Sequence, residues 1–344
     1  MHLTQVMAGA AHGGAETFFT TLAAALEGDG VDQSLVIRPH AHRVEALRAA
    51  GCTVETAPFG GGLDLRTPGI LRRHLRDHGA TVALAWMNRA ASKLPAGPWL
   101  RAARLGGYYD LKYYRGFDHL IAIIPGIRRH ILDGGWPEHR VHTIPNFCEV
   151  DAAAVPVPRA DHGTPDDAPL LLALGRLHPA KGLDVLLHAL VEVPAAWLWI
   201  AGEGPNRAEL EALADSLGVA GRVRFLGWRT DRTALMGAAD MVVFPSRYEP
   251  NGTVTVEAWA HGKPLVVADA AGPAEMVRDG DDALLVPKDD AAALAGAIRR
   301  VLDSRDLGAH LAGRGLERVA AEFSRASVVA RYRALMDALK AADA

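Results

Sequence analysis

Short apolar segments alternate with helical segments along almost the whole chain, and this alternation restricts the possible folds more than any other feature. In the first part, the predicted strands are residues 2–7, 33–37, 82–86, 119–124 and 141–144. Helical stretches such as 16–27 and 68–77 separate them. Strands that alternate with helices form parallel sheets covered by helices on both faces. We therefore predict an α/β fold with doubly wound, Rossmann-like sheets.

The alternation stops once, at residues 148–169, a stretch rich in proline, alanine and aspartate that is typical of a linker. It then begins again, with predicted strands at 170–174, 197–201, 223–226, 241–244, 265–268 and 284–286. A chain of 344 residues is long enough for two domains. We predict an N-terminal domain of residues 1–150 and a C-terminal domain of residues 151–324.

Composition excludes several classes of protein. The formal net charge of -3 gives no argument for nucleic-acid binding. The two cysteines, Cys52 and Cys148, lack metal-site spacing and indicate a reducing compartment. No apolar run approaches the ~20 residues that span a membrane, and the amino terminus lacks the pattern of a signal peptide. We expect a cytoplasmic protein.

Residues 246–262 carry two carboxylates around a turn. Glu249 follows a predicted strand and precedes a Pro-Asn-Gly break, and Glu257 lies in the helix that begins after it. The amides of Gly252, Thr253 and Val254 open this helix, and helix starts bind anions. Two carboxylates around an anion site suit a ligand with both phosphate and sugar hydroxyls. The alternative is an unrelated loop acid and surface helix acid.

Two other loops follow predicted strands. Arg176 and Lys181 bracket a loop before a helix, where two cations can hold a diphosphate or remain solvated. Gly13 and Gly14 open the first predicted helix and allow a ligand to approach the backbone. The G-x-G-x-x-G spacing of a dinucleotide site is absent, which disfavours a nicotinamide dehydrogenase.

Six motifs in order carry a resemblance to a known family. They are GGAE at 13–16, GR-x4-KG at 175–182, FLG at 225–227, AD-x4-PS at 239–246, E-x7-E at 249–257 and GKPLVVADAAGPAEMVRDG at 262–280. The series resembles the retaining glycosyltransferases of family four. The resemblance implies the GT-B fold, in which two Rossmann-like domains face each other across a cleft. It also implies that the amphipathic C-terminal segment, about 325–344, crosses back to the N-terminal domain.

The resemblance assigns roles to individual residues. Glu257 would bind the ribose of a nucleotide, Glu249 would lie by the donor sugar, and Arg176 with Lys181 would grip the diphosphate. Further donor contacts are implied for Asn251, Gly252, Thr253, Val254, Gly13, Gly14, Arg224 and Phe225, the last two at the nucleobase. Many members carry a bulkier residue where Asn251 stands, so we expect a donor pocket of different polarity.

The acceptor side departs from the family pattern. Gly106-Gly107-Tyr108 stands where many members carry a histidine, and His12 is a candidate substitute. Asn88 and Arg89 are acceptor-side candidates because they follow a predicted strand. Basic and aromatic residues interleave over residues 89–115, which suits an anionic membrane surface or glycan. The alternative is a solvated face with buried tyrosines.

The resemblance implies a retaining transfer of sugar from a nucleotide-diphosphate sugar to a glycan or lipid-linked glycan, in bacterial surface polysaccharide or lipopolysaccharide synthesis. It implies no cofactor and no metal, and we find no Asp-x-Asp on a plausible loop. The enzyme would act in the cytoplasm or at the inner face of the cytoplasmic membrane. The alternatives are a nucleotide-sugar epimerase or hydrolase and a non-catalytic nucleotide-sugar-binding module. Arg176, Lys181 and Glu249 argue against the module, since binding alone needs no paired cations at a leaving group.

Overall fold

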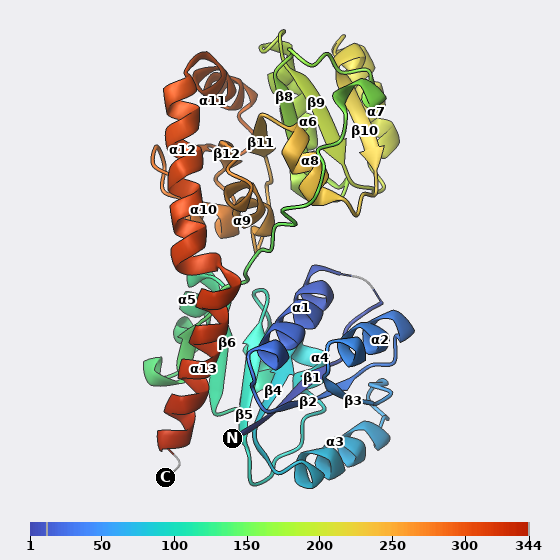
Figure 1. Ribbon diagram of the computed structural model, residues 1–344, viewed down its shortest axis with the longest axis vertical. Coiled ribbons are helices and arrows are strands. Elements are labelled where there is room, and N and C mark those ends of the chain that lie inside the picture. Colours follow the sequence, from blue (N-terminus) through green and yellow to red (C-terminus); the bar gives the residue numbers. More distant parts are fainter. Residues whose placement is uncertain (12, 343–344) are drawn as a thin grey trace. The chain divides into compact units, whose positions relative to one another are not determined.

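The computed structural model describes residues 1–11 and 13–342, which form two compact units (Figure 1). The first unit contains Met1–Asn146 together with the chain from Arg325 onward, and the second contains Phe147–Ser324. The last helix therefore belongs to the first unit although it follows the second in sequence. None of the helices in the described ranges combines the length and apolar composition that a membrane crossing needs.

The first unit is built on seven parallel strands in the order β3-β2-β1-β4-β5-β6-β7. The strands are β1 (His2–Met7), β2 (Gln33–Ile37), β3 (Thr53–Thr56), β4 (Ala80–Trp86), β5 (Leu100–Leu105), β6 (His119–Ala122) and β7 (Val141–Thr143). The helices are α1 (Gly14–Gly28), α2 (Ala41–Ala49), α3 (Arg66–Asp77), α4 (Met87–Ala91), α5 (Pro125–Asp133) and α13 (Arg325–Ala342).

The second unit is built on six parallel strands in the order β10-β9-β8-β11-β12-β13. The strands are β8 (Leu170–Leu174), β9 (Trp197–Ala201), β10 (Val223–Gly227), β11 (Met241–Phe244), β12 (Leu265–Ala268) and β13 (Leu284–Val286). The helices are α6 (Leu183–Val191), α7 (Arg207–Ser216), α8 (Arg232–Ala238), α9 (Thr253–Ala260), α10 (Ala271–Met276), α11 (Ala291–Asp303) and α12 (Arg305–Arg318). Two Rossmann-like sheets confirm the predicted fold class.

Both sheets reverse their strand order at one point, between β1 and β4 in the first and between β8 and β11 in the second. Parallel strands all end at the same edge of a sheet, and the loops diverge where the order reverses. Ligands of doubly wound sheets bind there. The loops that follow β8 and β11 are therefore the first place to look for a site in the second unit.

A buried arginine joins helix α13 to the first sheet. Arg104 of β5 is 3% exposed, and its Nε donates to the Tyr332 hydroxyl of α13 at 3.0 Å. Its guanidinium lies over the rings of Phe18 and Trp86, 4.8 and 4.5 Å from their centroids. A second N–H donates to the side chain of Asn146. Burial lowers the pKa of Arg104. Aromatic faces attract a desolvated cation, so these contacts stabilise the packing of α13.

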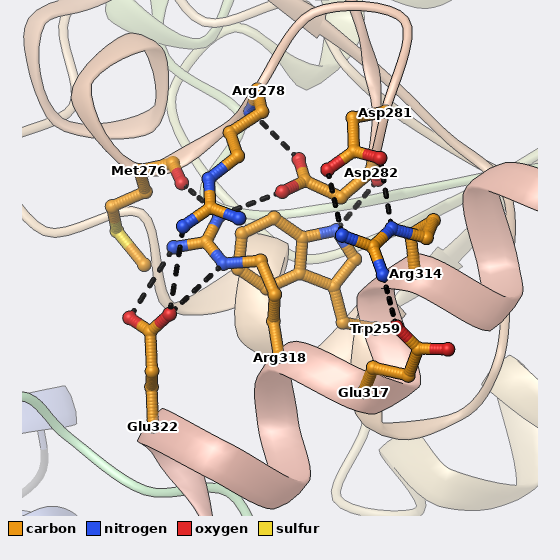
Figure 2. A network of polar contacts seen from close by, with 9 residues as sticks. All are labelled: Trp259, Met276, Arg278, Asp281, Asp282, Arg314, Glu317, Arg318 and Glu322. Carbon is orange, nitrogen blue, oxygen red and sulfur yellow. Dashed lines mark hydrogen bonds and ion pairs between the residues drawn. The ribbon is translucent and has the colours of Figure 1, made fainter.

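A second buried arginine anchors helix α9 (Figure 2). Arg318 of α12 pairs with the fully buried carboxylate of Asp282 at 2.7 Å and lies 4.7 Å from the ring centroid of Trp259. The indole N–H of Trp259, on α9, donates to the Asp282 carbonyl at 2.8 Å. Arg318 also donates to the carbonyl of Met276 at the end of α10. The network holds α9 through the side chain of Trp259, which therefore serves packing.

The outer part of this network is exposed. Arg314, one turn before Arg318, pairs with Asp281 at 2.8 Å and also contacts Glu317 (Figure 2). Asp281 and Asp282 therefore act as turn acids with arginine partners, and Asp290 caps α11 by accepting from Ala293 N at 2.8 Å. These three aspartates therefore have structural roles.

Replacing the buried arginine should destabilise the second unit strongly. Arg318→Ala leaves the Asp282 carboxylate buried without its cation, which costs about 3 kcal/mol or more. Arg314→Ala is the matched control, because the same change one turn away removes only exposed ion pairs and should have little effect. Urea unfolding followed by tryptophan fluorescence measures both. Equal effects of the two substitutions would contradict this account of the network.

Candidate active site

An ion pair connects the two loops at the switch point of the second sheet. Lys181 ends a short 3-10 turn after β8, and its Nζ donates to Oε2 of Glu249, which follows β11. The two side chains are 23% and 14% exposed. Gly182 allows this close approach, because its φ is +60° and a Cβ there would lie 2.1 Å from the carbonyl oxygen of Pro245.

The second carboxylate oxygen of Glu249 caps the start of α9. It accepts from the amides of Asn251 and Gly252 at 3.3 and 3.4 Å. The expectation that the amide of Gly252 is free is therefore wrong, because the chain's own carboxylate occupies part of the anion site. The amides of Thr253 and Val254 have no hydrogen-bond acceptor within the described residues. Glu249 thus occupies the position that suits an anionic ligand group.

Arg247 holds both loops of the ion pair in place. Its guanidinium binds both carboxylate oxygens of Asp184 at 2.7 and 2.6 Å, and it also contacts Asp289 at 2.5 Å and the Pro179 carbonyl at 2.8 Å. Hydrogen bonding to Asp184 raises the pKa of Arg247, and the same bond lowers the pKa of Asp184. The backbone N–H of Arg247 donates to the Ala180 carbonyl at 2.9 Å. The geometry around Lys181 is therefore set without a ligand.

Arg176 lies at the same sheet edge, and its side chain is exposed. Its guanidinium has no acceptor or carboxylate partner in the part of the chain that the structure describes. Beside it, the loop after β9 packs tightly, since a Cβ at Gly202 would lie 1.8 Å from the Gly175 carbonyl oxygen. The glycine of this G-x-G sequence thus serves backbone packing. Arg176 and Lys181 together provide the two cations that the sequence predicted.

Glu257 lies on α9 and reaches toward helix α8. Its Oε2 lies 2.5 Å from Nη2 of Arg232, and its side chain is 17% exposed. Burial raises the pKa of Glu257 to about 7, although the charge of Arg232 opposes this shift. The ion pair is close, yet no donor within the described ranges makes a well-directed hydrogen bond to Oε2. This carboxylate oxygen is therefore buried against the Arg232 cation.

The edge strand β10 ends at Gly227, shortly before α8 and Arg232 in the sequence. Phe225 precedes an irregularity in β10, and its ring lies 5.9 Å from the guanidinium of Arg207. Trp228 follows the strand and is 74% exposed. Arg224 is not brought to this group, because its guanidinium binds the His162 carbonyl at 2.6 Å. The contacts of Arg224 therefore support packing of the segment before β8 and not contact with a ligand.

The site in the second unit is thus a row of groups along one sheet edge. Cations and helix amides lie at the loops after β8 and β11, and the Glu257 carboxylate, paired with Arg232, lies farther along α9. An exposed aromatic ring follows the edge strand β10. Such a row can hold a ligand with an anionic centre, hydroxyl groups and a flat ring.

The sequence model of the family described as glycosyl transferases group 1 matches residues 156–318. Two curated relatives are similar over nearly their whole length, the lipopolysaccharide core biosynthesis glycosyltransferases LpsE and LpsD of Rhizobium meliloti (strain 1021). LpsE is 36% identical over 328 residues, covering 94% of this chain and 96% of the relative. LpsD is 36% identical over 329 residues, covering 94% and 95%. The chain is a group 1 glycosyltransferase.

Solved structures agree with this fold. HepE of Anabaena in complex with UDP superposes with a TM-score of 0.85 at 20% identity, covering 98% of this chain and 100% of that one. The lipopolysaccharide outer core galactosyltransferase WaaB superposes with a TM-score of 0.76 at 17% identity, covering 98% and 99%. At these identities the comparison shows the shared GT-B architecture. The family and fold that the motifs indicated are both confirmed.

The glycine loop of the glycosyltransferase lies in the first unit. Gly14 begins α1, and the carboxylate of Glu16 turns back to accept from the amide of Ala10 at 2.8 Å. The buried guanidinium of Arg43 donates to the Ala10 carbonyl at 2.7 Å. This loop is braced from both sides, and Gly13 precedes the helix within it. His12 lies outside the described residues.

The acceptor-side candidates follow β4 and β5 at the same edge of the first sheet. Asn88 and Arg89 lie in α4 directly after Met87, whose φ of +60° is strained for a non-glycine residue. Tyr108 follows β5, with its ring 5.7 Å from that of His130. His130 lies close to the position where the family often has a histidine, although it comes from α5.

The basic and aromatic segment 89–115 does not form one exposed face. Trp99, Arg104 and Tyr114 are 6%, 3% and 0% exposed. Arg104 packs between aromatic rings, and burial raises the pKa of Tyr114. Contact of the exposed basic residues of this segment with an anionic membrane or glycan stays a prediction, as does the alternative of a solvated face with buried tyrosines.

The sequence analysis missed three residues at or near the site of the second unit, Arg232, Arg247 and Trp228. It also missed His130, which lies beside Tyr108 in the first unit. Arg247 stands two positions before Glu249, and this nearness in the sequence could have identified it as a site residue. The other three are brought in from separate elements and carry no local pattern.

The pKa of Glu257 gives the glycosyltransferase a pH-dependent donor affinity. A carboxylate accepts from sugar hydroxyls, so the ionised form should bind, and it is lost as the pH falls through about 7. Between pH 8 and pH 6, the Michaelis constant for the donor should rise roughly tenfold. The control is Glu257→Gln, which should bind weakly with little dependence on pH. A Michaelis constant that stays constant over this range in the unmodified protein would contradict the assignment.

Proposed function

We propose that this glycosyltransferase moves a sugar from a nucleoside diphosphate sugar to a glycan or lipid-linked glycan of the lipopolysaccharide core. The observation that carries the proposal is the group at the start of α9, where Lys181, the Glu249 carboxylate and the first helix amides meet. Relatives named for lipopolysaccharide core biosynthesis support the acceptor class. A similar fold was solved with UDP-glucose, which supports the donor class.

The donor would lie along the sheet edge of the second unit. Arg176, Lys181 and the amides of Thr253 and Val254 would hold the diphosphate, with charge-assisted hydrogen bonds from both sides. The Glu257 carboxylate, which pairs with Arg232, would accept from the ribose hydroxyls. The ring of Trp228 and the end of β10 near Phe225 would take the nucleobase. The role of Gly13 and Gly14 at the donor phosphates stays a prediction.

The chemistry would retain the configuration of the anomeric carbon. The bond between this carbon and the phosphate oxygen breaks, and the acceptor oxygen forms the new bond on the same face. The acceptor proton passes to the departing phosphate. Arg176 and Lys181 stabilise the charge that develops on the diphosphate, as preorganised groups do in other transfer reactions. Because these two cations supply positive charge beside the departing diphosphate, we propose that no metal is required.

Diphosphate binding would change the partner of Lys181. In the free protein, Lys181 is neutralised by Glu249. A diphosphate offers Lys181 a second anion, and the Glu249 carboxylate then faces the donor sugar, next to the reacting carbon. A negative group there stabilises the positive charge that develops on the sugar as the bond breaks.

Donor and reaction class are tested together. A thermal-shift panel of nucleotide sugars identifies the donor, since binding to the folded state raises its stability. With that donor, EDTA and a truncated core-oligosaccharide acceptor, transfer should proceed near its untreated rate. NMR of the product should show the anomeric configuration of the donor.

Three results would contradict the proposal in different ways. Loss of activity in EDTA that manganese restores would overturn metal independence. An inverted product would overturn the retaining mechanism. Release of free sugar at the same rate with and without acceptor would identify a hydrolase, which is one of the alternatives.

A further inference from the structure

Glu257 lies in surroundings that disfavour its charge. Its side chain is 17% exposed, and no described donor makes a well-directed hydrogen bond to its Oε2. Burial raises the pKa of a carboxyl group, because the charged form loses more hydration than the neutral form. For Glu257, burial raises the pKa to about 7. This carboxylate therefore needs a counter-charge to stay ionised near neutral pH.

Arg232 supplies that counter-charge from a neighbouring helix. It is the first residue of α8, and its Nη2 lies 2.5 Å from Oε2 of Glu257. The Arg232 side chain is 43% exposed, so it keeps part of its hydration. The charge of Arg232 lowers the pKa of Glu257 and opposes the larger effect of burial. The pair thus shifts this carboxyl group toward its charged form.

The other titratable groups beside Glu257 bring no positive charge near neutral pH. Cys148, in the segment between β7 and β8, lies within reach of the Glu257 charge, and burial raises its pKa to about 12, so it is a neutral thiol. Glu149, next to it, is a further acid. Nδ1 of His261, one turn later on α9, lies 2.7 Å from the Glu257 carbonyl oxygen. Burial lowers the pKa of His261, so its ring is neutral.

The cations on the elements that pack against α9 already have partners. Helix α12 brings Arg318, which pairs with Asp282 and with Glu322 (Figure 2). Lys263, which follows α9, donates to the Ala239 carbonyl at 2.7 Å. The strands β11 and β12 bring buried apolar side chains. None of these described groups is free to take the place of Arg232.

The backbone at Arg232 is held by packing that does not involve Glu257. Leu235 and Met236 of α8 are fully buried. At the end of this helix, the Ala238 carbonyl accepts from Nη2 of Arg159 at 2.7 Å. Because these contacts fix α8, a change of the Arg232 side chain should leave the helix in place.

We propose that Arg232 is a positioning residue for donor binding, which holds the Glu257 carboxylate in its charged form so that it accepts hydrogen bonds from two neighbouring hydroxyl groups of the donor. Hydrogen bonds to a charged acceptor are roughly twice as strong as those between neutral groups. Arg232 acts through Glu257 and not through its own contact with the donor. The proposal rests on the proposed function for the identity of the donor, a nucleoside diphosphate sugar whose ribose carries the two hydroxyls.

The Michaelis constant for the donor, measured from pH 6 to pH 9, tests this role. Arg232→Gln removes the counter-charge, so the Michaelis constant should begin to rise at a pH that is higher by about one unit. Compared with the unmodified protein, it should then be about fivefold higher at pH 7 and the same at pH 9. Arg232→Lys keeps the charge and should keep most of the unmodified profile.

Arg229→Gln is the matched control. Arg229 lies three positions before Arg232, and its Nε donates to Oδ1 of Asp231 at 2.8 Å. The same loss of charge at this position should leave unchanged the pH at which the Michaelis constant rises. Melting temperatures of the three variants show whether each is folded.

Titration of Glu257 in the free protein separates this proposal from the proposed function. With glutamate labelled at its carboxyl carbon, the carbon NMR signal that Glu257→Gln removes belongs to Glu257. Its titration midpoint should lie near pH 7 in the unmodified protein and should be higher in Arg232→Gln. This measurement needs no donor, so its result keeps its meaning if the proposed donor is wrong.

Three results would overturn the proposal, each in a different way. A Michaelis constant that Arg232→Gln raises equally at pH 7 and pH 9 would show that Arg232 contacts the donor itself. An unchanged titration midpoint in Arg232→Gln would show that Arg232 does not hold the carboxylate in its charged form. A midpoint that moves as expected, beside a Michaelis constant that is independent of pH in both proteins, would overturn the role of both residues in donor binding and leave only their pairing.

Discussion

The Glu249 carboxylate is the interaction on which the donor side of this enzyme depends. One oxygen neutralises Lys181 and the other caps the start of α9, so a single side chain joins the loops after β8 and β11. Both partners are largely buried, and a buried cation without a counter-charge is expensive. The pair therefore holds the loops after β8 and β11 together at the start of α9. We propose that a diphosphate binds at this cation and these helix amides.

The carboxylates of Glu249 and Glu257 can serve one ligand only if α9 keeps its position. The helix is short, and its position comes from the Arg318, Asp282 and Trp259 network behind it (Figure 2). That network uses the face of α9 opposite to the ligand groups, so fixing the helix costs no ligand contact. Glu249 at its start and Glu257 near its end are thereby held at the two ends of one rigid element.

Much of this arrangement could be predicted from the sequence, because buried parallel strands are short apolar runs and β/α alternation is visible. Two strands escaped prediction for a physical reason. β3 is a sheet edge and carries polar residues, and β5 contains Arg101 and Arg104, which read as surface residues until the surrounding rings are seen. The motif glutamates and cations were found because their spacing follows from one loop and one helix. Arg232 and Trp228 were missed because only tertiary packing places them, and Arg224 matched a motif position although its guanidinium binds backbone carbonyls.

The central claim is that the two ends of one donor are held for different purposes, by Glu257 at the ribose and by Arg176 at the diphosphate. Steady-state kinetics of Glu257→Ala and Arg176→Ala, each checked for folding, tests it most directly. Loss of a contact made equally in the ground and transition states raises the Michaelis constant, and loss of one made mainly in the transition state lowers turnover. Glu257→Ala should therefore raise the Michaelis constant for the donor more than it lowers turnover. Arg176→Ala should lower turnover on the order of 100-fold. If Glu257→Ala leaves donor affinity unchanged, the ribose role of Glu257 is wrong, and the account of this sheet edge as a donor site fails with it.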